Sequence, residues 1–236
     1  MRIIALDTAS GFCSAALLID GELRVREQVT RREHAQLILP MIDSLLREAD
    51  VALSSLDAVA FGRGPGSFTG LRIAASVTQG LAFGANLPVL PVSDLRALAQ
   101  QALDLRGLQG IAGPATDVHA LACMDARMRE VYWSVHLADV AGLAVDAHER
   151  VSAPSAVSLQ GVDPDSVFAA GCGLAAYAAE LAVIGLSSAR SLQQAEPHAR
   201  DVARLAAADF AAGLAQDASD ALPVYLRDNV AQVPPP

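Results

Sequence analysis

The chain contains no lysine, because all 17 of its basic residues are arginine. This absence excludes a lysine Schiff base, a lysine general base and the phosphate-binding lysine of a Walker motif. The 26 acidic residues give the 236-residue chain a net charge of −9. Phosphate neutralisation supplies most of a protein's affinity for nucleic acid. Such an acidic chain is therefore a poor binder of nucleic acid by itself, and any RNA is expected to be held through a partner.

Cysteines and long apolar runs are also scarce. The three cysteines, Cys13, Cys123 and Cys172, are odd in number and far apart, which predicts buried free thiols instead of disulfides or a metal knuckle. No apolar run is long enough to span a bilayer. At the start of the chain Asp7 interrupts the apolar stretch after four residues, which argues against a signal peptide. We therefore expect a soluble, cytoplasmic protein that does not associate with membranes.

The patterns of a metal site and of a serine nucleophile are missing. The five histidines include no pair spaced i, i+4 and no complete HExxH motif. Each is expected to be solvated or satisfied within the core, with His34 on the surface or capping a helix start. Pro65 stands where a nucleophile elbow around Ser67 would need its first glycine. We predict no catalytic residue and no metal-binding residue.

The stretch FGRGPGSFTGLRIA, residues 61–74, is rich in glycine and has two interpretations. Glycines let backbone N–H groups converge on an anion, and Ser67 or Thr69 can cap a following helix. The spacing nevertheless fits neither GxxxxGK[ST] nor GxGxxG. The simpler interpretation is a strand-to-helix turn that needs positive φ at one or two glycines. The pattern by itself favours the turn.

The order of predicted elements repeats along the chain. Hydrophobic periodicity predicts the order βββαβαβ in the first half, with strands at 3–6, 14–19, 23–29, 58–61 and 88–92 and helices at 33–49 and 69–84. The same order begins again at His119, with strands ending at 125 and covering 130–138, 144–151 and 167–170, and a helix at 174–181. This repetition suggests duplication of one α/β unit. A linker is expected at 107–117 and a last helix at 197–213.

Asp7 and Asp125 end equivalent strands in the two halves. In a two-lobed fold such strand ends can bring carboxylates near a metal-bound nucleotide. The alternative is an aspartate that accepts hydrogen bonds from nearby backbone amides. Neither acid is followed by a glycine that would let a phosphate approach the backbone. We assign no cofactor-binding residue, and any degenerate phosphate site would consist of Asp7, Ser10, Gly64, Gly66, Ser67 and Asp125.

Two of the predicted helices have features of an interface. Gly80 costs about 1 kcal/mol in a helix interior relative to alanine, and close approach of another helix would explain it. The helix at 33–49 is apolar on more than one stripe, which indicates deep burial or a second face for a partner. Together the two helices would provide half of a four-helix interface. The residues expected at this interface are Leu37, Met41, Arg72, Ala75, Ser76 and Gly80.

Four stretches of the chain resemble the TsaB family, also called YeaZ. They are ALDTAS (5–10), FGRGPGSFTGLRIA (61–74), MDARMREVYW (124–133) and PVYLRDNVA (223–231), and they occur in the family's order across nearly the whole chain. Members of this family are bacterial subunits of the machinery that makes threonylcarbamoyladenosine next to the tRNA anticodon. The resemblance implies an actin-like ATPase (ASKHA) fold of class α/β, built from two ribonuclease-H-like lobes, which agrees with the repeated element order.

The resemblance also implies a heterodimer with TsaD, the homologous catalytic subunit, and transient association with the ATPase TsaE. In TsaD a histidine pair spaced H-x-x-x-H holds the active-site metal, whereas the matching segment here, residues 92–98, has no histidine. The chain is therefore expected to be a non-catalytic scaffold that activates TsaD. It would have no cofactor of its own, with ATP or ADP bound only at the level of the complex and tRNA reached only through the complex.

Two other classes of function remain open. The family was long labelled glycoprotease-like, so one alternative is a hydrolase or an independent ATPase. The other is a self-associating protein whose helices pair two copies of the chain.

The expected division of the chain is a first lobe at 1–106, a second, degenerate lobe at 107–196 and a tail at 214–236, with the helix at 197–213 packing back on the first lobe.

Overall fold

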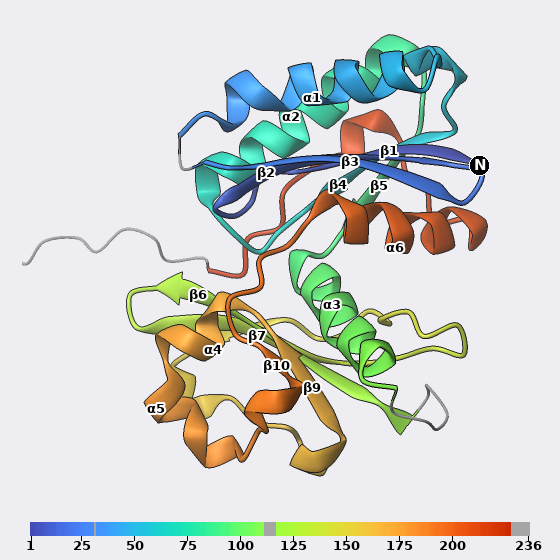
Figure 1. The fold of residues 1–236 in the computed structure, drawn as a ribbon. Helices are drawn as coiled ribbons and strands as arrows, with labels where there is room; N and C mark the ends of the chain where they lie inside the picture. Colours follow the sequence, from blue (N-terminus) through green and yellow to red (C-terminus); the bar gives the residue numbers. More distant parts are fainter. Residues whose placement is uncertain (31, 111–116, 228–236) are drawn as a thin grey trace, which may run out of the picture.

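The computed structural model describes residues 1–30, 32–110 and 117–227 of the chain (Figure 1). Its first sheet has the strand order β3-β2-β1-β4-β5. The strands are β1 (Arg2–Asp7), β2 (Phe12–Ile19), β3 (Glu22–Val29), β4 (Ala58–Gly62) and β5 (Val89–Val92). The first three strands are antiparallel, and β4 and β5 continue the sheet parallel to β1.

The second sheet repeats this arrangement, with the order β10-β9-β6-β7-β8. Its strands are β6 (His119–Arg127), β7 (Glu130–Leu137), β8 (Arg150–Ser152), β9 (Val167–Ala170) and β10 (Ser191–Leu192). β6, β7 and β8 form an antiparallel meander, and β9 and β10 add in parallel on the other side of β6. Each strand of this sheet thus has a counterpart in the first, which confirms the predicted duplication of an α/β, ribonuclease-H-like unit.

Helices cover both faces of the first sheet (Figure 1). α1 (His34–Glu48) and α2 (Phe68–Ala85) lie on one face, and α6 (Ala199–Ala211) packs on the other against β1, β2 and β4. In α1 the buried Ile38, Ile42 and Leu45 recur at the helical spacing that the sequence shows. None of the helices in the described part of the chain combines the length and the apolar character needed to cross a membrane.

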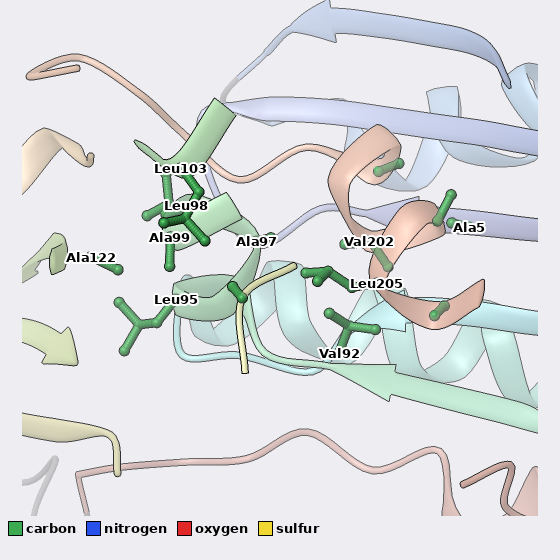
Figure 2. Close-up of a cluster of buried hydrophobic side chains, with 14 of the residues drawn as sticks. Ala5, Val92, Leu95, Ala97, Leu98, Ala99, Leu103, Ala122, Val202 and Leu205 are labelled. Carbon is green, nitrogen blue, oxygen red and sulfur yellow. The ribbon is translucent and has the colours of Figure 1, made fainter. Parts of the chain in front are cut away.

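The helix α3 (Asp94–Leu108) lies between the two sheets and is absent from the order predicted by periodicity. All ten residues from Asp94 to Leu103 are buried. Four of these buried residues, Asp94, Arg96, Gln100 and Gln101, are polar, so their residue types do not mark the helix as a buried one. Figure 2 shows that Leu95 and Leu98 of α3 belong to one core cluster with Ala122 of β6 and Leu205 of α6. This core joins the two sheets.

The second half departs from the prediction in three places. The strand expected at 144–151 is reduced to the short β8 and a single bridge between Ala138 and Ala144, which follows a turn where Asp139 accepts hydrogen bonds from the N–H groups of Ala141 and Leu143. The helix expected at 174–181 is broken at Tyr177 into α4 (Cys172–Ala176) and α5 (Ala178–Leu181). α3 continues to Leu108, into the expected linker, while residues 111–116 lie outside the described residues.

The C-terminal segment, residues 214–227, contacts both sheets. Gln216 bridges to Val89 of β5, and the N–H of Val224 donates to the carbonyl of Arg63 at 2.7 Å. The Arg227 guanidinium then binds the carboxylate of Glu130 on β7. The expected tail at 214–236 is therefore bound to the rest of the protein over these residues, and residues 228–236 lie outside the described part. The lobe boundaries at 106 and 196 stay a prediction.

Candidate functional site

The glycine loop, residues 62–67, follows β4 and packs directly on the turn after β1. The Ser67 N–H donates to the Ala9 carbonyl at 2.7 Å, and the Thr8 hydroxyl donates to the Gly70 carbonyl at 2.7 Å. A Cβ at Gly66 would lie 2.7 Å from the Ala9 carbonyl oxygen, and one at Gly70 would lie less than 3.0 Å from that of Thr8. The glycines are therefore required because two backbones approach closely.

Two N–H groups of this loop that could bind a phosphate are used inside the chain. The Gly64 N–H donates to Oδ2 of Asp94, and the Ser67 N–H is bonded to Ala9. The Ser67 hydroxyl caps α2 by accepting from the Gly70 N–H at 3.4 Å. Gly64 has φ +111°, a conformation that side-chain-bearing residues rarely adopt. This geometry favours the interpretation of the loop as a strand-to-helix turn.

Two buried carboxylic acids, Asp7 and Asp94, meet beneath the loop. Oδ1 of Asp7 accepts from the Ala9 N–H at 2.9 Å, and both side chains are fully buried. Apart from each other, Oδ2 of Asp7 and Oδ1 of Asp94 have no hydrogen-bond partner. Both oxygens lie beside Gly62, where an added Cβ would be less than 3.0 Å from each of them. Burial raises the pKa of Asp94 well above its usual range, and the charge of Asp7 and the hydrogen bond between the two acids raise it further. The pair therefore shares one proton.

The remaining residues of the predicted phosphate set are only partly brought together. Ser10 adjoins the loop, and its hydroxyl accepts from the Phe12 N–H at 3.2 Å. Asp125 ends β6 in the other sheet, where it accepts from the Arg127 N–H at 2.8 Å and from the Tyr177 hydroxyl at 3.1 Å. Asp7 and Asp125 both accept hydrogen bonds from backbone amides two residues ahead, as expected of aspartates that end strands.

Cys13 and Cys123 are buried free thiols, as predicted, whereas Cys172 is only half-buried. Burial raises the pKa of the Cys13 thiol to about 11 and that of Cys123 to about 12, so neither is a thiolate at neutral pH. His136 is satisfied in the core by the Ser134 hydroxyl and the Val145 carbonyl, each at 2.7 Å. His34 is buried at the start of α1, with Nε2 3.1 Å from the Ser10 carbonyl, and is not on the surface. Among the described residues no three His, Cys, Asp or Glu side chains gather to hold a metal.

Arg63, in the glycine loop, forms a bidentate ion pair with Glu149 beside β8 of the second sheet. The two guanidinium nitrogens donate to the carboxylate at 3.0 and 3.2 Å, and the side chains are only 22% and 7% exposed. Charge-assisted bonds of this geometry are stronger than exposed pairs. The pair therefore links the glycine loop to the second sheet.

Arg63→Gln and Glu149→Gln are each expected to lower the free energy of unfolding by about 1.5–3 kcal/mol, because each leaves a half-buried charge without its partner. The double variant should lose less than the sum of the two single losses. Urea denaturation measures this coupling. Arg47→Gln, at a pair whose arginine is 79% exposed, is the control and should change stability by less than about 0.5 kcal/mol. Additive losses at Arg63 and Glu149 would contradict the link.

The predicted interface residues lie on α1 and α2, which contact each other on the outer side of the first sheet (Figure 1). Arg72, Ser76 and Gly80 are exposed along α2, and Leu37 and Met41 of α1 are half-buried. Ala75 is the exception: it is 5% exposed and its methyl group packs in the core beneath α2, so it supports the helix from within. Five of the six residues thus lie on the outer side of α1 and α2, Ala75 does not, and their role at an interface stays a prediction.

Several features of the site are not visible in the sequence. Asp94 lies at the start of the unpredicted α3, so nothing in the linear pattern brings it to Asp7. The Arg63–Glu149 pair joins residues 86 positions apart. The signals that exist are local: Ser93 precedes Asp94 and caps α3 by accepting from the Arg96 N–H at 3.1 Å, a recognisable helix-start pattern.

Comparison with known proteins gives a consistent result. Residues 25–234 match the family model described as "TsaD: tRNA N6-adenosine threonylcarbamoyltransferase". The tRNA threonylcarbamoyladenosine biosynthesis protein TsaB of Escherichia coli (strain K12) is 40% identical over 98% of this chain and 96% of its own length. The similarity therefore covers both sheets and the segments that join them.

Solved structures give the same picture. The structure described as YeaZ from Pseudomonas aeruginosa is 42% identical, covers 95% of this chain and 99% of its own, and superposes with a TM-score of 0.82. A second structure, of an uncharacterized protein with similarity to peptidase YEAZ from Pseudomonas aeruginosa, is 43% identical, covers 96% and 99% of the two chains, and has a TM-score of 0.83. The actin-like, duplicated fold expected from the sequence is confirmed.

Proposed function

Because this chain belongs to the TsaB (YeaZ) family, we propose that it serves tRNA threonylcarbamoyladenosine biosynthesis as a non-catalytic subunit that binds and activates its catalytic paralogue, TsaD. In this proposal TsaD transfers the threonylcarbamoyl group to the adenosine next to the anticodon. TsaE associates transiently, tRNA is reached only through the complex, and ATP or ADP binds only at the level of the complex. We also propose that the protein works in the cytoplasm.

The observation that carries the proposal is the outer face of α1 and α2. A groove of about 460 Å³ lies between the two helices, lined by Ala35, Phe68, Thr69, Arg72, Ile73, Ser76 and Val77. Large apolar side chains stand exposed on the same helices, with Phe83 at 84%, Phe68 at 50% and Leu39 at 48% exposure. Of these three side chains Phe68 lines the groove, and exposed apolar side chains spread along two neighbouring helices are typical of a protein-binding face. A partner that supplies two helices would complete a four-helix interface.

Gly80 lets a partner helix come close to α2. A Cβ built at Gly80 meets nothing within 4 Å, and the same holds for Gly84 one turn further on. Neither glycine is therefore needed for packing inside the chain, although each costs about 1 kcal/mol in a helix interior. Close contact with another helix is the physical reason that remains for them.

The glycine loop supports an accessory role more than a catalytic one. The N–H groups of Gly64 and Ser67 are bonded inside the chain, and the acids behind the loop are buried and share a proton. A phosphate group would have to displace these bonds and approach a buried carboxylate pair. We therefore propose that this region maintains the shape of the first sheet and the position of α2.

Gly80→Arg tests the interface. The variant is expected to fold with a melting temperature no lower than that of the unsubstituted chain, because the space over Gly80 is open and arginine is a better helix former than glycine. It is expected to lose the complex with TsaD in size-exclusion chromatography and sedimentation. Gly107→Arg is the matched control, since Gly107 is also an exposed helical glycine with open space but lies on α3. It should bind TsaD as the unsubstituted chain does. Unchanged binding by Gly80→Arg would place the interface elsewhere.

Reconstitution tests the activating role. TsaD and TsaE, supplied with the threonylcarbamoyl-adenylate and tRNA, are expected to modify the tRNA only when this chain is added. Equal modification without the chain would refute the role. Sedimentation of the chain by itself reports whether the same face pairs two copies, and nucleotide turnover by the chain that Asp7→Ala abolishes would favour an ATPase instead.

A further inference from the structure

An arginine and two aromatic side chains are stacked where α2 begins. The Arg72 guanidinium lies 3.7 Å from the ring centroid of Phe68, and its Nε donates to the Tyr225 hydroxyl at 3.1 Å. The rings of Phe68 and Tyr225 are 5.4 Å apart. These rings are 50% and 42% exposed, although their mutual contacts already order them. The stack is therefore a pre-organised surface feature, which lowers the entropy cost of binding.

The turn between β6 and β7 presents a second group of exposed side chains. Arg127, Met128 and Arg129 are three successive residues with positive φ, at 62°, 53° and 61°. A two-residue hairpin loop with positive φ favours Asn-Gly, whereas Met128 and Arg129 hold these positions here. Each such residue costs about 1 kcal/mol or more. The Arg127 side chain is nevertheless 88% exposed, and Met128 is 64% exposed. These residues keep a strained backbone although no burial of their side chains compensates for it. This indicates that the exposed side chains have a function at the surface.

The C-terminal segment brings these two groups together. Arg227 contacts the Met128 sulfur at 3.5 Å and pairs with Glu130, while Tyr225, two residues earlier, holds Arg72. Two residues span at most about 7 Å, so the turn and the start of α2 are neighbours. Both lie at the same side of the molecule in Figure 1. Phe68 and Arg72 also line the groove on α1 and α2, which makes the whole surface continuous with it.

The composition of this surface fits a protein partner better than RNA. Aromatic residues, methionine and arginine are the types enriched at protein interfaces and at their energetic centres. Arg127 is paired with Asp125 and Arg227 with Glu130, so the positive charge left for phosphates is small in a chain of net charge −9. Within the described residues Arg72 and Arg129 have no carboxylate partner, which leaves two arginines for acidic groups of a protein.

We propose that the partner interface extends beyond α1 and α2 across Tyr225 and onto the β6–β7 turn, where an acidic surface of the paralogous partner covers Met128 and Arg129. The inference rests on the proposed function, since the partner is the same. It adds that the partner touches both sheets of this chain. Partner binding would thereby hold the second sheet in a set position relative to α2.

Met128→Glu and Arg129→Glu, each made singly, test the extension. Each is expected to raise the dissociation constant for the purified partner by about tenfold or more, with an unchanged melting temperature, because each side chain is exposed. Val140→Glu is the matched control: Val140 is an apolar residue of the second half that is 91% exposed in the turn after β7. It adds the same charge as Met128→Glu and should leave binding unchanged.

The outcomes separate this inference from the proposed function. If the unsubstituted chain binds and Gly80→Arg abolishes binding, but Met128→Glu and Arg129→Glu behave like Val140→Glu, the interface stops at the helices and the extension is wrong. If the two turn variants bind the partner normally but the complex retains tRNA less well, the turn is an RNA contact and the proposal is equally overturned. If the unsubstituted chain does not bind at all, the proposed function itself fails.

Discussion

Gly70→Ala is expected to destabilise the protein by about 3 kcal/mol or more, the upper end of the range for overpacking. A Cβ at this position would lie less than 3.0 Å from the Thr8 carbonyl oxygen, and the Thr8 hydroxyl is bonded to the Gly70 carbonyl. The atoms nearest to that Cβ, the carbonyl carbon and oxygen of Thr8 and the Cα of Ala9, all belong to the backbone, so none can rotate away. Thermal unfolding should show the melting temperature lowered by roughly 6–12 °C.

The control for this prediction lies in the same helix. Gly80→Ala makes the same chemical change in α2, but its Cβ meets nothing within 4 Å. It should stabilise the chain by up to about 1 kcal/mol, because alanine is the better helix former. Effects of opposite sign at Gly70 and Gly80 are the expected result. Two changes of the same sign would mean that close packing on Thr8 is not what requires Gly70.

Asp94→Asn is expected to make the protein more stable at alkaline pH. In the unsubstituted chain burial and Asp7 raise the pKa of Asp94, so the folded state keeps a proton that the unfolded state has released. The stabilisation is complete below the ordinary aspartate pKa of about 4 and is lost as pH rises toward the raised value. Over that window the free energy of unfolding falls by about 1.4 kcal/mol per pH unit.

Asparagine at this position can satisfy both partners at any pH. Its amide N–H group can donate to Oδ2 of Asp7, and its carbonyl oxygen can accept from the Gly64 N–H that Asp94 now accepts. Urea denaturation at a series of pH values between 5 and about 9 should therefore give a flatter profile for Asp94→Asn than for the unsubstituted chain.

Asp201 contributes to the same profile and must be separated from Asp94. Burial raises its pKa to about 6, so its own loss of stability is complete by about pH 7 in both proteins. Asp50→Asn, at an exposed position, is the control and should leave the profile unchanged. Identical slopes for Asp94→Asn and the unsubstituted chain above pH 7 would show that the two acids do not share a proton.

The duplicated fold was predictable because its signals are local. Strands such as β1 and β2 alternate or run apolar over several residues, and α1 has buried residues at helical spacing. The two halves repeat these signals in the same order, and their sheets have the same strand order. The glycine loop was likewise predictable as a turn, because a glycine cluster between a strand and a helix is typical of a turn.

Periodicity missed the parts of the structure whose environment is set by residues far away in the sequence. α3 is buried from Asp94 to Leu103 although it carries polar residues, because groups far away in the sequence bind them, as Asp209 binds Arg96. Asp94 became part of the site only because α3 starts beneath the glycine loop. The strain in the β6–β7 turn is also invisible in sequence, since Arg-Met-Arg carries no turn signal and its positive φ values appear only in the folded chain.

By itself the amino-acid sequence determined the α/β class, the repeated unit, the family and the position of the glycine loop, because each depends on residue types at short spacing. The tertiary structure decided what the loop does. Gly66 of the loop and Gly70 after it are there because the backbone that follows β1 packs against them, and the N–H groups of Gly64 and Ser67 are bonded to Asp94 and Ala9. Which groups occupy the donors of a loop depends on contacts between distant segments, and those exist only after the chain has folded.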